Sequence, residues 1–189
     1  MDPVESFRKQ VNENIKRLGD DKEVQNLSRV WSRETNRNGY TYNFSWLGRP
    51  IIQYPQDIVA MQEIIWSTQP DLIVETGIAH GGSLIFSASM LELNAACGGK
   101  KDARVLGIDI DIRSHNREAI EAHPLARRID MIQGSSVSDD VTARVKEAAR
   151  GKESVLVILD SNHTHEHVLA ELEAYAPLVT LGSYCLVYD

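Results

Sequence analysis

The sequence has very little cysteine and no long apolar run. Cys97 and Cys185 lie far apart without a metal-binding spacing, so we interpret them as small core residues of a reduced, cytoplasmic protein. No apolar stretch approaches the roughly 20 residues of a membrane span. The acidic N-terminus has no apolar region of the kind found in signal peptides. A membrane is therefore not an expected partner.

Basic residues are outnumbered by acidic ones, and the formal net charge is -7. This balance argues against nucleic acid or an anionic membrane surface as the main partner. The 189 residues, 42% of them hydrophobic, are sufficient for an ordinary globular core.

The N-terminal part of the chain is expected to be a helical and aromatic extension. Apolar residues over 4–18 recur every three or four positions and predict an amphipathic helix, and a second short helix is predicted around 24–31. The aromatic-rich segment 40–55 is predicted to be an irregular lid or a short hairpin, and packing on the core is favoured over contact with a substrate. We therefore divide the chain into residues 1–56 and 57–189.

After a helix over 57–68, apolar strands alternate with helices. Strands are expected at 71–75, 104–109, 128–133, 154–160 and 182–189, and helices at 81–97, 114–122, 138–149 and 163–175. Continuous Val, Ile and Leu in such strands predict a doubly wound, mostly parallel α/β sheet. The fifth strand ends the sequence, so we expect either a truncated sheet or an edge covered by another chain, for example in a homo-oligomer.

A glycine-rich turn follows the first of these strands and opens the next helix. It contains, in order, Glu75, Gly77, His80, Gly81, Gly82 and Ser83. Backbone N–H groups at such a helix start can bind an anion. The pattern is not G-x-G-x-x-G, and Glu75 would repel a pyrophosphate, so an NAD-dependent oxidoreductase is disfavoured. A cationic or zwitterionic ligand is favoured. His80 either contacts this ligand or is exposed to solvent.

Polar residues also end the later strands. Asp109 is placed to accept hydrogen bonds from both hydroxyls of a ribose. Ser135 and Ser136 are small residues that can lie against a flat ring. Asp160 and Asp189 end neighbouring strands, so their carboxylates are predicted to converge on one hard cation, and Mg²⁺ suits this sparse set of oxygens.

His163 is predicted to lie one turn beyond Asp160, at the start of a helix. Histidine has the unperturbed pKa expected of a general base near neutrality. An alternative is a transition-metal site of His163 and His167, which are four residues apart. It lacks the glutamate and the spacing of H-E-x-x-H, so His165 and His167 are expected to be surface or supporting residues.

Together these motifs resemble the cephalosporin hydroxylase/rhamnosyl O-methyltransferase family over about residues 40–189. The motifs are the turn at 74–83, Gly107-Ile108-Asp109, Leu159-Asp160-Ser161-Asn162-His163 and Val187-Tyr188-Asp189. That family is similar to catechol-type, magnesium-dependent methyltransferases that use S-adenosylmethionine (SAM). The resemblance implies a Rossmann-like class I methyltransferase fold.

The resemblance also implies roles for individual residues. The SAM loop would be Glu75, Gly77, His80, Gly81, Gly82 and Ser83, with Ser83 at the methionine carboxylate. Asp109 would bind the ribose, Ser135 and Ser136 would lie beside the adenine, and Asp160 would contact both cofactor and metal. Asp160 and Asp189 would hold Mg²⁺, and His163 would be the base. The family usually has an adjacent pair of polar ligands where this sequence has Tyr188 and Asp189.

The activity implied is Mg²⁺-assisted transfer of methyl from SAM to a hydroxyl of a sugar or small natural product. Two alternatives stay open. One is a hydroxylase-type role on a β-lactam nucleus, although no facial-triad iron set is visible near the turn. The other is a non-catalytic SAM-binding subunit.

Overall fold

The computed structural model describes residues 2–188 and divides into two compact units, the first ending at Thr41 and the second beginning at Tyr42. The first unit contains two helices, α1 (Pro3–Asp20) and α2 (Lys22–Arg37). Helix α2 is longer than the one predicted around 24–31. The Asp21 carboxylate caps its N-terminus, and polar residues continue the helix beyond the last apolar position.

The second unit opens with an antiparallel hairpin of β1 (Phe44–Trp46) and β2 (Arg49–Ile51), after a 3₁₀ turn at Tyr40–Asn43. Of the two predicted forms of this segment, the hairpin is confirmed. The Trp46 indole donates to Ser89 Oγ at 3.0 Å. The hairpin therefore belongs with the sheet, whereas the sequence had grouped it with residues 1–56.

The rest of the second unit alternates strands and helices as expected. Its elements are α3 (Pro55–Thr68), β3 (Leu72–Thr76), α4 (Gly82–Ala96), β4 (Arg104–Asp109), α5 (Ser114–Glu121), β5 (Ile129–Gln133), α6 (Asp139–Ala149), β6 (Val155–Leu159), α7 (His165–Tyr175) and β7 (Cys185–Val187), with 3₁₀ turns at Ala126–Arg128 and Ala176–Leu178. All five strands of the sheet are parallel, in the order β5-β4-β3-β6-β7. This confirms the doubly wound parallel sheet.

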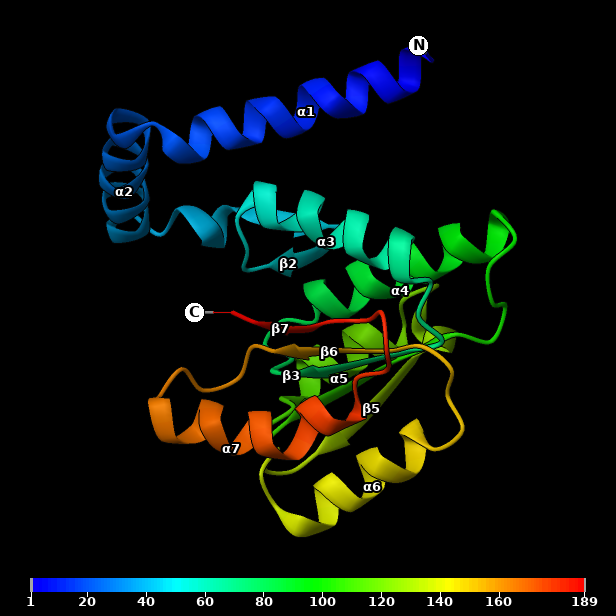
Figure 1. Cartoon of the computed structure of the whole chain (residues 1–189). Helices are drawn as coiled ribbons and strands as arrows, with labels where there is room; N and C mark the ends of the chain where they lie inside the picture. Colours follow the sequence, from blue (N-terminus) through cyan, green and yellow to red (C-terminus); the bar gives the residue numbers. More distant parts are fainter. Residues whose placement is uncertain (1, 189) are drawn as a thin grey trace. The chain divides into compact units, whose positions relative to one another are not determined.

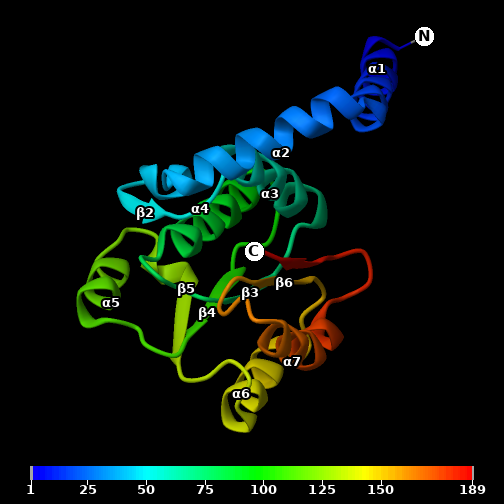
Figure 2. The ribbon, with the colours of Figure 1, turned by 90° about the vertical axis from the view of Figure 1, so that its left-hand side faces the viewer.

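Helices cover both faces of the sheet. Helices α3 and α4 lie on one side and α6 and α7 on the other, in both views (Figures 1 and 2). Alternate residues along β3 enter different cores: Ile73 packs in the core with α4, and Val74 packs in the core with α6 and α7. Helix α4 is buried on almost every side, since it lies between the sheet and the layer of α3 and the hairpin.

Two simple expectations can be checked against the described part of the chain. No helix within residues 2–188 is long and apolar enough to cross a membrane. Cys97 caps the end of α4 and is exposed, and Cys185 is half-buried. The prediction that both thiols are core residues is therefore wrong for Cys97, because the helix ends in solvent.

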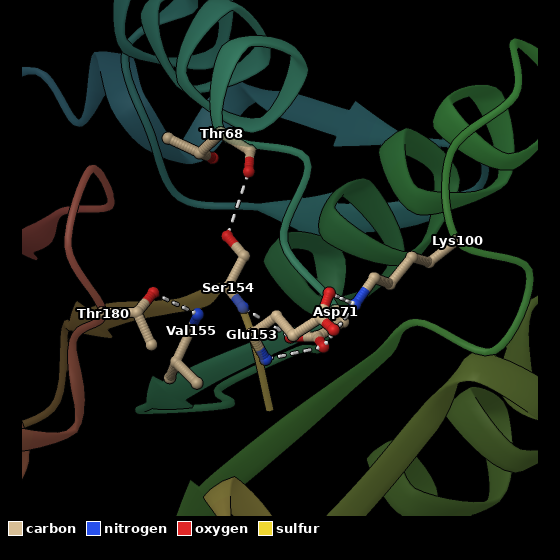
Figure 3. Close-up of polar contacts among 7 residues, drawn as sticks. All are labelled: Thr68, Asp71, Lys100, Glu153, Ser154, Val155 and Thr180. Carbon is tan, nitrogen blue, oxygen red and sulfur yellow. Dashed lines mark hydrogen bonds and ion pairs between the residues drawn. The ribbon is translucent and has the colours of Figure 1, made fainter. Parts of the chain in front are cut away.

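A buried carboxylate ties the amino ends of the central strands together (Figure 3). Asp71, which is 6% exposed, accepts from the backbone N–H groups of Glu153 and Ser154, each at 3.0 Å. Lys100 Nζ lies 3.1 Å from the same carboxylate. Burial acts to raise the pKa of Asp71, but the backbone donors and Lys100 outweigh it and hold the pKa below its ordinary value. This network lies at the edge opposite the carboxyl ends, so we assign it to stability.

Replacing Asp71 with asparagine is expected to destabilise the fold by about 2 kcal/mol at neutral pH, the scale of hydrogen bonds to a charged group. Because the folded-state pKa is lowered, the contribution is present above the unfolded value near about 4 and is lost as pH falls through the folded value. Urea unfolding should show wild type and variant converging in acid. Asp130→Asn, which loses an exposed ion pair with Arg104, is the control and should cost under about 1 kcal/mol. An equal difference at all pH values would contradict this account.

Candidate functional site

Two adjoining cavities of about 210 and 230 Å³ lie at the carboxyl ends of the central strands. They share Gly77, Ala79, Asp160 and Ser161 as walls, so together they form one groove. Strand β3 is flanked by β4 on one side and by β6 on the other, and this is where the order of strands reverses. In open α/β sheets ligands bind in the crevice at this point.

The glycine turn comes very close to the end of β6. Gly77 has φ +91, and a Cβ atom built there would lie 1.9 Å from the Asp160 backbone oxygen. At Gly82 a Cβ atom would lie 2.1 Å from the Pro50 oxygen of the hairpin. Gly81, with φ +82, is the N-cap of α4. The glycines therefore allow close approach of three backbone segments, and Gly77, Gly82 and Ser83 line the first cavity.

Asp109 fixes the conformation of this turn. Its Oδ2 accepts from the backbone N–H groups of Ile78 at 2.8 Å and Ala79 at 3.3 Å. Its Oδ1 accepts from the N–H of Asp111 at 3.0 Å. A carboxylate has about four acceptor positions, so little capacity remains for the two ribose hydroxyls that the sequence assigned to it. Asp109 still lines the second cavity.

The outer side of the turn is held by two residues that the sequence did not single out. Asn116 Nδ2 donates to the Ala79 oxygen at 2.9 Å, and Arg49 Nη2 donates to the His80 oxygen at 2.6 Å. Arg49 also donates to Asn116 Oδ1 at 3.0 Å. These residues are far apart in sequence, so no local pattern could have identified them. The side chain of His80 is exposed and lines the first cavity.

Glu75 lies under the groove at the end of the central strand and is 1% exposed. Its Oε1 accepts a short hydrogen bond from the hydroxyl of Ser83, which lines the first cavity. Its Oε2 is buried and has no hydrogen-bond partner among residues 2–188. Burial raises the pKa of Glu75 to about 8, against the effect of the Ser83 hydrogen bond and with a smaller contribution from the charge of Asp160.

Asp160 is positioned where the two cavities meet. Burial raises its pKa to about 6, while the charge of His163 acts to lower it and that of Glu171 to raise it. His163 Nε2 lies 3.9 Å from Asp160 Oδ1. His163 Nδ1 lies 3.1 Å from the Tyr188 backbone oxygen. The sequence thus correctly placed these two side chains together.

The sequence predicts that a helix starts at His163, but His163 lies before the helix in the structure. Helix α7 begins at His165, because the side chain of Asn162 accepts from the N–H of Thr164 at 3.0 Å and forms a local turn. His163 consequently lies in a loop at the rim of the first cavity.

The predicted metal ligands are only partly testable. Asp189 lies outside the described residues. Within 2–188, no group of three or more His, Cys, Asp or Glu side chains is arranged to hold a metal. His163 and His167 contact different partners: Nδ1 of His163 faces Tyr188 O, and Nε2 of His167 faces Glu171. This does not favour the two-histidine site.

Ser135 and Ser136 line the second cavity, as the sequence predicted, together with Ile108, Ile110 and His167. The hydroxyl of Ser136 lies 3.2 Å from His167 Nε2. His167 had been expected to be a surface or supporting residue. Its spacing of four from Glu171 on a helix was the one signal in the sequence that the two side chains pair.

The family model for Rhamnosyl O-methyltransferase/CmcI matches residues 38–189. The protein named rhamnosyl O-methyltransferase of Mycobacterium leprae (strain TN) is 32% identical over 151 residues, covering 77% of this chain and 59% of that protein. The protein of the same name of Mycobacterium tuberculosis (strain ATCC 25618 / H37Rv) is 31% identical over 139 residues, covering 70% and 51%. The chain thus spans between half and three-fifths of these curated relatives.

A solved structure described as "cmcI-D160 Mg-SAM" aligns with a TM-score of 0.53 and 23% identity, covering 78% of this chain and 58% of that one. At this identity the likeness concerns the fold. It confirms the predicted Rossmann-like architecture of class I methyltransferases.

Proposed function

We propose that this chain, which belongs to the Rhamnosyl O-methyltransferase/CmcI family, binds SAM in the groove and transfers its methyl group to a sugar hydroxyl with the help of Mg²⁺. The observation that carries the proposal is the buried, half-partnered Glu75 under the start of α4. The names of the relatives support the reaction and the class of acceptor.

The groove fits an amino-acid zwitterion better than a pyrophosphate. Gln53 Oε1 and, in the ionised carboxylate, Glu75 Oε2 are buried acceptors without a donor among the described residues, and Gln53 lines the first cavity. An ammonium group would supply donors to this acceptor-rich region. Two backbone N–H groups of the turn, those of Ile78 and Ala79, are already bonded to Asp109 and are not available to a phosphate. The N-terminus of α4, at Gly82 and Ser83, suits the carboxylate of the zwitterion.

The groove also offers an oxygen donor for Mg²⁺. Asp160 is a partly buried carboxylate with a raised pKa, so a bound cation would relieve the cost of its charge. Hard oxygen ligands of this kind, completed by water, suit Mg²⁺. Asp160 would hold the ion, and Asp189 remains a predicted second ligand.

His163 is the residue that would take the proton of the acceptor hydroxyl. With Nδ1–H donated to the Tyr188 oxygen, the lone pair of Nε2 points to the side of Asp160 and is free to accept a proton. When bound, SAM supplies an electrophilic methyl group and Mg²⁺ a Lewis acid for the acceptor oxygen. The groove would contribute chiefly by aligning the acceptor hydroxyl with the methyl group. In well-oriented reactions such alignment lowers the activation barrier by roughly 7–11 kcal/mol.

The acceptor would enter past Tyr42, a residue that is 69% exposed and lines the first cavity. An aromatic ring with an apolar face and a polar hydroxyl is a suitable surface for a sugar. The proposal is tested by incubating the chain with SAM and a panel of rhamnosyl and other glycosides, with Mg²⁺ or with EDTA. Mg²⁺-dependent methylation of a sugar hydroxyl is expected. Binding of SAM without methylation of any acceptor would favour a non-catalytic subunit.

Binding of SAM is expected to release a proton from Glu75 near neutral pH. The carboxyl, with its pKa raised to about 8, is largely protonated in the free protein at pH 7, and a bound ammonium would favour the ionised form. SAM affinity should therefore rise by up to about tenfold per pH unit as pH approaches 8.

Calorimetry in buffers of different ionisation enthalpy measures this proton release. Glu75→Gln cannot ionise and should bind SAM more weakly with no release. An equal release by wild type and Glu75→Gln would show that another group titrates.

A further inference from the structure

A cluster of buried and half-buried polar side chains lies behind the second cavity and has no role in the proposed transfer. Glu171, 1% exposed, lies on α7 with its Oε1 3.3 Å from His167 Nε2. The hydroxyl of Ser161 donates to the same Oε1 at 2.7 Å. Nε2 of His167 also lies 3.2 Å from Ser136 Oγ and 3.2 Å from Ser161 Oγ. One ring nitrogen thus has three oxygen neighbours.

This arrangement differs from a nucleophilic triad. In a triad the acid binds one ring nitrogen and the hydroxyl binds the other. Here Glu171 and both serines face the same nitrogen, so the cluster orients the ring instead of activating a serine. Tyr175 is fully buried, and its hydroxyl donates to the backbone oxygen of Ser136. This hydrogen bond fixes the loop that contains Ser136.

The ring so oriented is part of the cavity wall. The His167 side chain is 22% exposed and lines the second cavity beside Ser135 and Ser136. Because a carboxylate can only accept, Nε2 carries the proton shared with Glu171, and in the neutral ring Nδ1 is an acceptor. The other walls include Ile108 and Ile110, apolar side chains suited to the faces of a flat ring.

We infer that His167 recognises the exocyclic amine of the cofactor's adenine through Nδ1, and that Glu171 is the positioning residue that holds its ring. The inference rests on the proposed SAM function and adds a determinant of base specificity that the sequence motifs did not contain. An amine donates to Nδ1, whereas the carbonyl oxygen of hypoxanthine would face it as a second acceptor, leaving both unsatisfied.

The test compares binding of S-adenosylhomocysteine with that of its inosine analogue by calorimetry at about pH 8. Wild type should prefer the adenosyl ligand by about 10–100-fold. His167→Phe should reduce this preference to about threefold or less. His165→Phe, an exposed neighbour on the same helix, is the matched control and should keep the full preference.

Glu171 is tested by its effect on the same preference. Glu171→Gln retains an oxygen that can accept from Nε2 and should keep most of the preference. Glu171→Leu cannot orient the ring and should lose it. If the variants do not fold, ¹⁵N spectra of the histidine rings of wild type provide the measurement: Nδ1 of His167 should shift with the adenosyl ligand and not with the inosyl one.

Three results would overturn the inference. If wild type binds both ligands equally, or if His167→Phe keeps the preference, the base-recognition role fails while the proposed SAM function stands. If wild type binds neither ligand, the proposed function fails and the inference falls with it.

Discussion

Replacing Asp160 with alanine is expected to lower the rate of Mg²⁺-dependent methyl transfer by about 10²–10³-fold, the usual cost of removing one electrostatic group from a transition-state site. The carboxylate lies where both cavities meet, and its pKa is raised by burial, so a cation there would be its natural partner. The affinity for SAM should change much less, because most of the proposed cofactor contacts come from the turn and α4. Initial rates with a rhamnosyl acceptor, with Mg²⁺ and with EDTA, measure the effect.

Asp111→Ala is the matched control, since Asp111 is an exposed carboxylate just after the neighbouring strand β4. It should retain the wild-type rate and its sensitivity to EDTA. The Asp160→Ala rate should no longer respond to EDTA. Transfer by Asp160→Ala that remained fast and EDTA-sensitive would remove Asp160 from the metal site.

Replacing Gly77 with alanine is expected to destabilise the second unit by about 2–5 kcal/mol, the sum of a strained positive φ and an overpacked contact. The Cβ atom would lie 1.9 Å from the Asp160 oxygen, so β3 and β6 would have to separate at the floor of the groove. Any folded fraction should also bind SAM poorly, because the turn and the Asp160 loop would both move. Urea unfolding and calorimetry measure the two effects.

Gly98→Ala is the control that distinguishes the cost of backbone strain from the cost of the steric clash. Gly98 has φ +97, similar to that of Gly77, but a Cβ atom there would meet nothing within 4 Å. Gly98→Ala should cost only the backbone strain, about 1–2 kcal/mol, and should leave SAM binding unchanged. Equal stability of the two variants would show that the β3–β6 junction tolerates a side chain.

The fold was largely predictable because its signals are local. Apolar strands of the second unit alternate with amphipathic segments, and the bounds of β4 agree with the expected 104–109. The hairpin could not be separated from a lid, since its identity depends on contacts with α4, such as that of Trp46 with Ser89. The start of α7 was misplaced because a side-chain turn at Asn162 competes with the helix.

For the site, the sequence shows which strands end in polar residues. It does not show which groups those residues contact. Gly77, Asp160 and His163 do meet in the groove. Asp109, by contrast, uses most of its acceptor capacity on the turn, and one oxygen of Glu75 accepts from Ser83 while the other has no partner among residues 2–188. Such partners depend on how separate loops pack together, which periodicity and spacing do not encode.

The most direct test of the central claim, that the groove is a SAM site, is calorimetric titration of the chain with SAM and with NAD under the same conditions. Saturable binding of SAM with no detectable binding of NAD is predicted, because the groove offers acceptors to an ammonium and few free donors to a pyrophosphate. Saturable binding of NAD together with an absence of SAM binding would contradict the account.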